Sequence, residues 1–202
     1  MKPRGRGAPI GRPRTFDSDQ ALDRALRVFW ERGYEGTALS DLTKAMDINR
    51  PSLYAAFGNK EALFRKVLDR YVEGPGAFVG KALNEPTARA VVEGLLRGAA
   101  NLLTDRRNPQ GCLMVKGALS CGKSADPIRR ELASRRAADE AALRRRLRRA
   151  KSAGDLPTDS DPADLARYVV TVMRGMAVEA AGGASRVKLR RVIETALRAW
   201  PA

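Results

Sequence analysis

The chain has 202 residues and a formal net charge of +15, from 38 Lys and Arg against 23 Asp and Glu. It has no histidine and two cysteines, which excludes histidine-based catalytic triads, His-ligated zinc sites and a disulfide framework. No apolar run of about 18 residues and no secretory signal occur, so we expect a soluble, cytoplasmic protein without metal or cofactor. The positive charge favours a polyanionic partner such as nucleic acid.

Residues 1–15 are rich in Gly, Pro and Arg and contain no acidic side chain, which predicts a flexible basic arm. Arg12 and Arg14 flank a proline, a pattern suited to tracking DNA phosphates or entering a narrow minor groove. The alternative is a tail that only increases solubility.

From residue 17 onward the apolar periodicity is helical, and no alternating strand pattern exceeds a few residues, which predicts an all-α fold. Asp and Ser caps start helices, and Gly and Pro interrupt them. Helix starts are predicted at Asp17 or Ser18, at Asn84-Glu85-Pro86 with Pro86 in the first turn, at Asp126-Pro127 and Asp161-Pro162 with Asp as the N-cap, and at Ser185. Breaks or ends are predicted at Gly33, Gly58-Asn59, Gly74-Pro75-Gly76, Asn108-Pro109-Gln110-Gly111, Gly154 and Gly182-Gly183.

Residues 37–57 have the spacing of a helix-turn-helix, with helices over 39–46 and from about 50 to 57. Thr37 is the expected N-cap of the first helix, and Asp47 tolerates the left-handed backbone of the turn. Leu53 and Phe57 are expected to face the core, so the side chains between them point outward. A helix of this length fits a major groove about 12 Å wide. A generic helical hairpin would show the same apolar spacing.

Residues 16–72 resemble the N-terminal domain of the TetR/AcrR family of transcriptional regulators. The resemblance is carried by Gly33-Tyr34-Glu35-Gly36-Thr37, by Leu42-Thr43-Lys44-Ala45-Met46 and by the run from Arg50 to Phe64. Asp47 stands where that family usually has Gly. The resemblance implies an N-terminal three-helix helix-turn-helix DNA-binding domain (16–58), a connecting helix (59–75) and a C-terminal helical ligand-binding and dimerisation domain (76–202).

The resemblance also implies which residues touch DNA. Arg50 can make a bidentate contact to guanine, Pro51 can touch a thymine methyl, and Ser52 can reach a base or a phosphate. Alternatives are a core role for Tyr54, a solvated Lys60 and a salt bridge between Arg50 and Asp47 or Asp41. The expected DNA contacts are Arg12, Arg14, Thr37, Ser40, Arg50, Pro51, Ser52, Tyr54 and Lys60.

The last two helices carry apolar stripes that could pair two copies of the chain as a four-helix bundle, as the family resemblance also implies. Their residues are Leu165, Tyr168, Val169, Val172, Leu189, Val192, Ile193, Leu197 and Trp200. In the family, the middle helices hold an effector pocket. Its candidate lining residues are Phe78, Leu102, Leu103, Leu113, Met114, Met173 and Met176. For both sets the alternative is plain internal core.

Two further features have open interpretations. Residues 129–151 hold ten basic and three acidic side chains on one long helix, which indicates either a solvated surface or a contact with DNA or another anion. Cys112, at the expected start of a helix, is either a small buried side chain or a redox or electrophile sensor. Cys121 would face the opposite way on a continuous helix, which disfavours a disulfide between them.

Together these features predict a homodimeric, ligand-responsive DNA-binding regulator, a repressor that a small-molecule effector releases from a palindromic operator. The alternative is a basic architectural protein that binds nucleic acid without sequence preference. An enzyme is disfavoured because no nucleophile elbow, metal cluster or correctly spaced glycine motif occurs.

Overall fold

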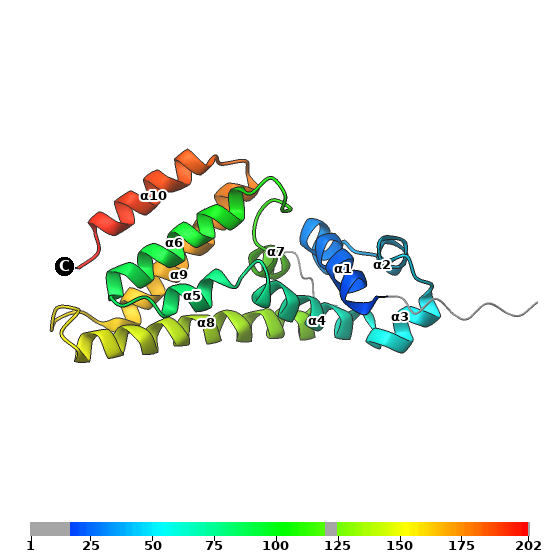
Figure 1. The fold of residues 1–202 in the computed structure, drawn as a ribbon, viewed down its shortest axis with the longest axis horizontal. Helices are drawn as coiled ribbons and strands as arrows, with labels where there is room; N and C mark the ends of the chain where they lie inside the picture. The colour runs from blue at the N-terminus through cyan, green and yellow to red at the C-terminus, as the bar shows by residue number, and fades with distance from the viewer. Residues whose placement is uncertain (1–16, 120–124, 202) are drawn as a thin grey trace, which may run out of the picture.

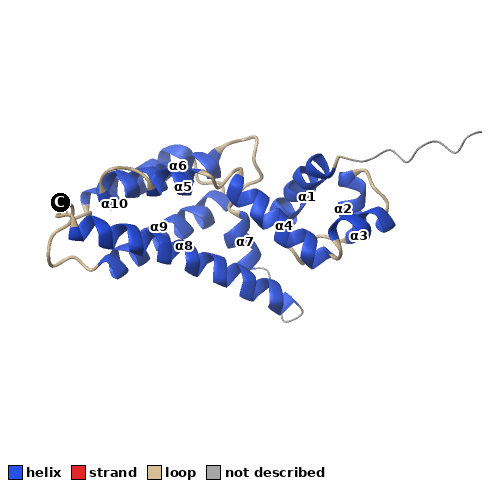
Figure 2. Cartoon of the chain, turned by 60° about the horizontal axis from the view of Figure 1, so that its bottom comes forward, coloured by secondary structure: helices blue, strands red, loops and turns tan. Residues whose placement is uncertain are grey.

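A computed structural model describes residues 17–119 and 125–201, in which ten helices and no strand occur. The protein is all-α, and Figure 2 shows helices joined only by loops and turns. Within these residues no helix is both long and apolar enough to cross a membrane. The helices are α1 (Ser18–Arg32), α2 (Leu39–Met46), α3 (Arg50–Phe57), α4 (Lys60–Glu73), α5 (Phe78–Leu83), α6 (Ala88–Thr104), α7 (Leu113–Leu119), α8 (Asp126–Ser152), α9 (Pro162–Ala181) and α10 (Arg186–Arg198).

Helices α1 to α4 form a lobe at one end of the elongated molecule (Figure 1). Phe29 of α1 lies at its centre and packs edge-on against the ring of Phe64 of α4, with 4.9 Å between the ring centroids. Four apolar residues of α7 and α8 complete this core, so the lobe is joined to the rest of the chain by direct packing. They are Leu113, Met114, Ile128 and Leu132.

A second core holds the larger part of the molecule together. Helix α6 contacts α5, α9 and α10, while α8 runs alongside α9 (Figure 2). The apolar stripe of α6 is almost completely buried, because helices cover it on several sides. Its buried residues are Ala88, Val91, Val92, Leu95, Leu96, Ala99, Ala100 and Leu103.

Most predicted helix limits are confirmed. The carboxylate of Asp17 accepts hydrogen bonds from the backbone N–H groups of α1, and Asp161 does the same for α9. The hydroxyl of Ser185 caps α10. Gly33 ends α1 with a φ of 71°, a conformation that glycine adopts without a steric penalty.

One helix was not predicted, and two predicted helix starts are displaced. Helix α5 was not predicted, because six residues are too few to show a helical period. Helix α6 starts at Ala88 and not at Pro86, since the hydroxyl of Thr87 accepts a hydrogen bond from the third residue of the helix at 3.1 Å. Asp126 is the first residue of α8 and not its cap, and its side chain pairs with Arg129.

Candidate nucleic-acid interface and internal cavity

The turn between α2 and α3 has the predicted geometry. Asp47 has φ 57° and ψ 45°, the left-handed conformation, and it is the one described non-glycine residue with a positive φ. Asn49 caps α3, since its side-chain oxygen accepts a hydrogen bond from the Ser52 N–H at 2.8 Å. The sequence placed Asn49 in the turn but did not identify it as the cap, although an Asn just before a Pro-containing first turn is a typical start signal.

Helix α3 buries one face and exposes the other. Leu53 and Phe57 are buried, as predicted, and Tyr54 is 46% exposed, which is inconsistent with a core role for this tyrosine. Arg50 and Pro51 are exposed and Ser52 is partly exposed. The N-terminal half of α3 therefore presents polar and basic side chains to solvent.

Arg50 has no ion pair or hydrogen bond among residues 17–119 and 125–201. The predicted alternative, a salt bridge to Asp47 or Asp41, does not form among these residues, and Asp41 instead pairs with Arg32 at 2.8 Å. The Ala38 backbone N–H also donates to the Asp41 carboxylate, and these contacts lower its pKa. The guanidinium of Arg50 is thus available for an external partner.

The assignment of Thr37 as a DNA contact and N-cap is wrong. Thr37 is 1% exposed and its hydroxyl donates to the Gly33 carbonyl oxygen at 2.7 Å, so its side chain secures the loop before α2. Ala38 occupies the N-cap position instead. Ser40, one turn on, is exposed on α2.

Lys60 is the first residue of α4 and is partly exposed. Its ammonium lies 4.4 Å from the centroid of the Tyr34 ring, a cation–π contact that orients the side chain. The predicted contacts Arg12 and Arg14 lie outside the described residues, as does Cys121.

The basic helix α8 uses much of its charge inside the chain. Arg135 pairs with Asp69 and Glu131, both at 2.7 Å, and Arg146 donates to the backbone carbonyls of Glu85 and Pro86. Exposed arginines remain at its C-terminal end, which lies opposite α3 along the molecule (Figure 1). These arginines are therefore remote from the surface that α3 presents.

A cavity of about 420 Å³ opens between the end of α4, helices α5 and α6, and helices α7 to α9. Five residues of the predicted set line it: Phe78, Leu102, Leu103, Met114 and Met173. The two other predictions are not supported, because Leu113 and Met176 are buried in the surrounding cores and do not reach the cavity wall. Tyr71 and Asp139 also line it and were not predicted. For Asp139 the reason is that a charged residue on a basic helix gives no signal of an inward orientation.

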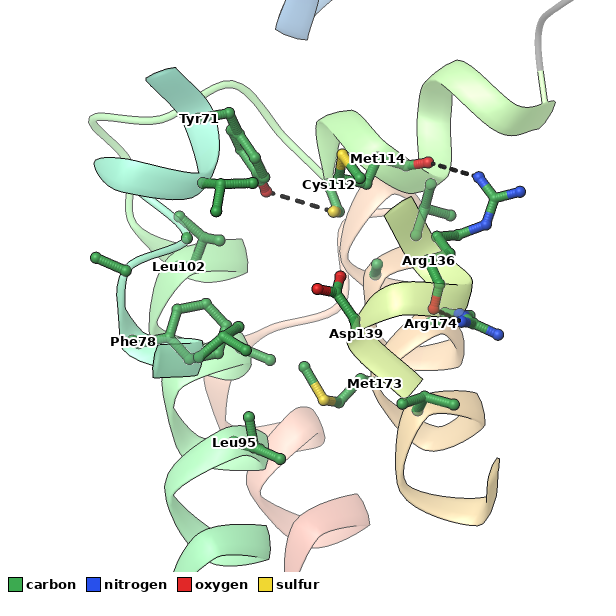
Figure 3. A pocket seen from close by; sticks show the side chains of 18 of the residues that line it. Tyr71, Phe78, Leu95, Leu102, Cys112, Met114, Arg136, Asp139, Met173 and Arg174 are labelled. Atoms are coloured by element: carbon green, nitrogen blue, oxygen red, sulfur yellow. Dashed lines mark hydrogen bonds between the residues drawn. The ribbon is translucent and has the colours of Figure 1, made fainter. Parts of the chain in front are cut away.

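Tyr71 connects this cavity with the N-terminal lobe. Its hydroxyl lies 3.3 Å from the Cys112 sulfur (Figure 3), and its ring packs edge-on against Trp30 of α1 at 4.8 Å. The indole N–H of Trp30 donates to the Gly111 carbonyl oxygen at 2.8 Å. Burial, and then the neighbouring Cys112, raise the pKa of Tyr71, so its hydroxyl stays protonated and can donate to the sulfur.

Much of the predicted dimer surface is internal. Five of its residues are buried within the single chain, where α9 and α10 pack on α6: Val169, Leu189, Ile193, Leu197 and Trp200. Their assignment to an interface is therefore wrong, because these positions form the inner faces of the two helices. Tyr168 and Val192 are exposed, and Leu165 and Val172 are partly buried.

A helix-turn-helix whose second helix exposes an arginine and a tyrosine is the architecture of a DNA-binding protein. The family model of the tetR family of bacterial regulatory proteins matches residues 21–67, and that of the tetracyclin repressor-like C-terminal domain matches residues 88–196. The chain belongs to the TetR family of transcriptional regulators.

Individual relatives agree with this assignment. The HTH-type transcriptional repressor ComR of Escherichia coli is 37% identical over 193 residues, which cover 95% of this chain and 92% of ComR. The HTH-type transcriptional repressor BdcR of Escherichia coli is 34% identical over 125 residues, 61% of each chain. A cysteine mutant of the TetR family transcriptional regulator CifR, in complex with a 26-base-pair operator DNA, is 44% identical with a TM-score of 0.89, covering 94% of this chain and 100% of that one.

Proposed function

We propose that the protein is a homodimeric repressor that reads a palindromic operator through α3 and leaves it when a small molecule fills the cavity. Arg50, exposed at the start of α3 and without a partner among the described residues, carries this proposal. The operator complex of the similar regulator CifR supports it. A cavity more than 400 Å³ in volume lies within the range typical of small-molecule sites.

At the DNA, Arg50 reads guanine, and Pro51 and Ser52 contact the neighbouring bases. Tyr54, Lys60 and the exposed Ser40 hold phosphates. Arg12 and Arg14 of the basic arm reach an adjacent groove. Phosphate contacts fix the register of the protein on the duplex, and base contacts give it sequence preference.

A second copy of the chain covers the outer faces of α9 and α10. These faces expose large apolar side chains that a solvated helix does not need, among them Tyr168, Val178, Val187 and Val192. A single helix-turn-helix makes few base contacts, so a dimer on two half-sites supplies the affinity and the symmetry of the site.

Effector binding is coupled to DNA binding through Tyr71. A ligand in the cavity displaces the phenol ring from Cys112, and the ring in turn contacts Trp30 of α1. Because α4 ends beside the cavity and begins beside α3, its movement shifts α3 in the groove. By linkage, operator DNA weakens effector binding by the same factor.

Selection of binding sites from random duplexes tests this function. A dimeric repressor should enrich one palindromic sequence and bind it about 1,000-fold or more tighter than random DNA, with a steep dependence on salt. Fluorescence anisotropy against unlabelled random duplex measures this ratio. Equal competition by random duplex would instead support the architectural, sequence-neutral alternative.

Charges on the outer faces of α9 and α10 should separate the dimer. The double substitution Tyr168→Glu and Val192→Glu is expected to weaken self-association at least tenfold, because like charges would face each other across an apolar contact. Sedimentation velocity over a concentration series measures the dissociation constant. Asn101→Glu, on the exposed surface of α6, is the control and should leave it unchanged. A double variant as dimeric as the wild type would show that the two copies meet elsewhere.

A further inference from the structure

One carboxylate points into the cavity and has no partner there. Asp139 of α8 is directed toward the space between Phe78 and Cys112 (Figure 3). Within the part of the chain that the structure describes, it forms no hydrogen bond or ion pair. Most of the lining is apolar, and the charged residues on it besides Asp139 are Glu73, Arg136 and Arg174.

The neighbouring arginines are engaged elsewhere. The guanidinium of Arg136 extends to the opposite side of α8, where it donates to the Met114 carbonyl oxygen at 3.3 Å (Figure 3). Arg174 donates to the Arg136 carbonyl oxygen at 3.3 Å. Arg135 pairs with two other carboxylates. None of them forms an ion pair with Asp139.

Asp139 is exposed, yet the protein around it disfavours the charged form of its carboxylate. Solvent reaches this residue through the open side of the cavity, yet the surrounding protein desolvates the carboxylate and raises its pKa, an effect that Arg174 and Arg135 oppose. A partly desolvated carboxylate is stabilised by a positively charged hydrogen-bond donor. The opposite wall supplies the rings of Phe78 and Tyr71 and the side chain of Leu102, which suit an apolar body.

We infer that the effector is a small amphipathic amine whose ammonium group binds Asp139 and whose apolar part fills the space between Phe78, Leu102 and Met173. The inference rests on the proposed function, since it names the chemistry of the molecule that occupies the same cavity. A carboxylic acid is disfavoured because it would meet the Asp139 carboxylate, while Arg136 donates to a backbone oxygen on the other side of the helix.

Three probes that share a phenylalkyl group and differ in their polar end test which polar group the cavity prefers: phenylbutylamine, phenylbutanol and phenylbutyrate. Calorimetry with the full-length chain is expected to show the amine binding about tenfold or more tighter than the alcohol, because a hydrogen bond to a charged group contributes about 1.5–3 kcal/mol. The acid should bind most weakly. The amine should also release a selected operator at the lowest concentration, measured by fluorescence anisotropy.

Asp139→Asn keeps the size of the side chain and removes its charge, so it should abolish the preference for the amine over the alcohol. Glu93→Gln is the control, because it removes a carboxylate of α6 that pairs with Arg97 and does not line the cavity, and it should keep that preference. The order of the three binding affinities on the wild-type chain still tests the preference for an amine if Asp139→Asn fails to fold.

The inference is overturned if the acid binds best, if no probe binds, or if the amine preference survives in Asp139→Asn. The proposed function has a separate readout, the binding of the selected operator by the wild-type chain without any probe. Sequence-specific operator binding combined with the wrong probe order would reject the amine and leave the repressor intact. Absence of sequence-specific binding would reject the repressor itself.

Discussion

Trp30→Ala should lower the free energy of unfolding by about 3–5 kcal/mol, the range for removing a large aromatic side chain from a core. Trp30 is 2% exposed, packs edge-on against Tyr71 and donates its indole N–H to the Gly111 carbonyl oxygen. The substitution would leave a cavity and an unsatisfied carbonyl where the N-terminal lobe joins α7. Urea unfolding followed by circular dichroism measures the change.

Trp30→Phe separates the two contributions. It retains most of the apolar volume and removes the indole N–H, so the expected loss is about 1–3 kcal/mol, the cost of an unpaired buried acceptor. A change below about 1 kcal/mol for Trp30→Ala would show that this joint contributes little to stability. Trp30→Ala should also respond more weakly to an effector, because Trp30 is the residue that Tyr71 contacts on α1.

Arg50→Ala should weaken operator binding by about 1–3 kcal/mol and relax the preference at one base pair of each half-site. The reason is that Arg50 is exposed at the start of α3, has no partner within the described chain, and carries donors that match the edge of guanine. Anisotropy titrations on the selected operator and on single-base variants of it measure both effects.

The control for Arg50 is Arg148→Ala, which also removes an exposed arginine, but at the far end of α8 (Figure 1). It should leave operator affinity nearly unchanged. An equal loss on all sequences for Arg50→Ala, with a salt slope reduced by about one, would identify Arg50 as a phosphate contact and not as a base reader.

The helices and the exposed face of α3 could be predicted from the sequence, because their causes are local. Asp17, Asp161 and Ser185 cap the helices that follow them through hydrogen bonds two or three residues away. Leu53 and Phe57, four residues apart, fix which side of α3 is buried, so the outward position of Arg50 follows from spacing alone. The left-handed Asp47 is equally a property of a single turn.

Which partner covers a buried side chain was decided by the tertiary structure. The apolar stripes of α9 and α10 indicate that one face of each helix is covered, but a stripe is the same whether α6 or a second chain covers it. Val169 and Ile193 pack inside the chain, and Tyr168 and Val192 do not. Likewise, the Thr37 hydroxyl donates to the Gly33 carbonyl oxygen and is unavailable to a phosphate. No pattern of residue types in the sequence indicates this hydrogen bond.

By itself, the sequence determined the helical fold, the helix-turn-helix and the family, since caps, turns and apolar periods act over only a few residues. The tertiary structure alone determined the cavity, the inward orientation of Asp139 and the contact of Tyr71 with both Trp30 and Cys112. Tyr71 lies 41 residues from both Trp30 and Cys112, and the cavity lining runs from Tyr71 to Ala177, so these features depend on how whole helices pack.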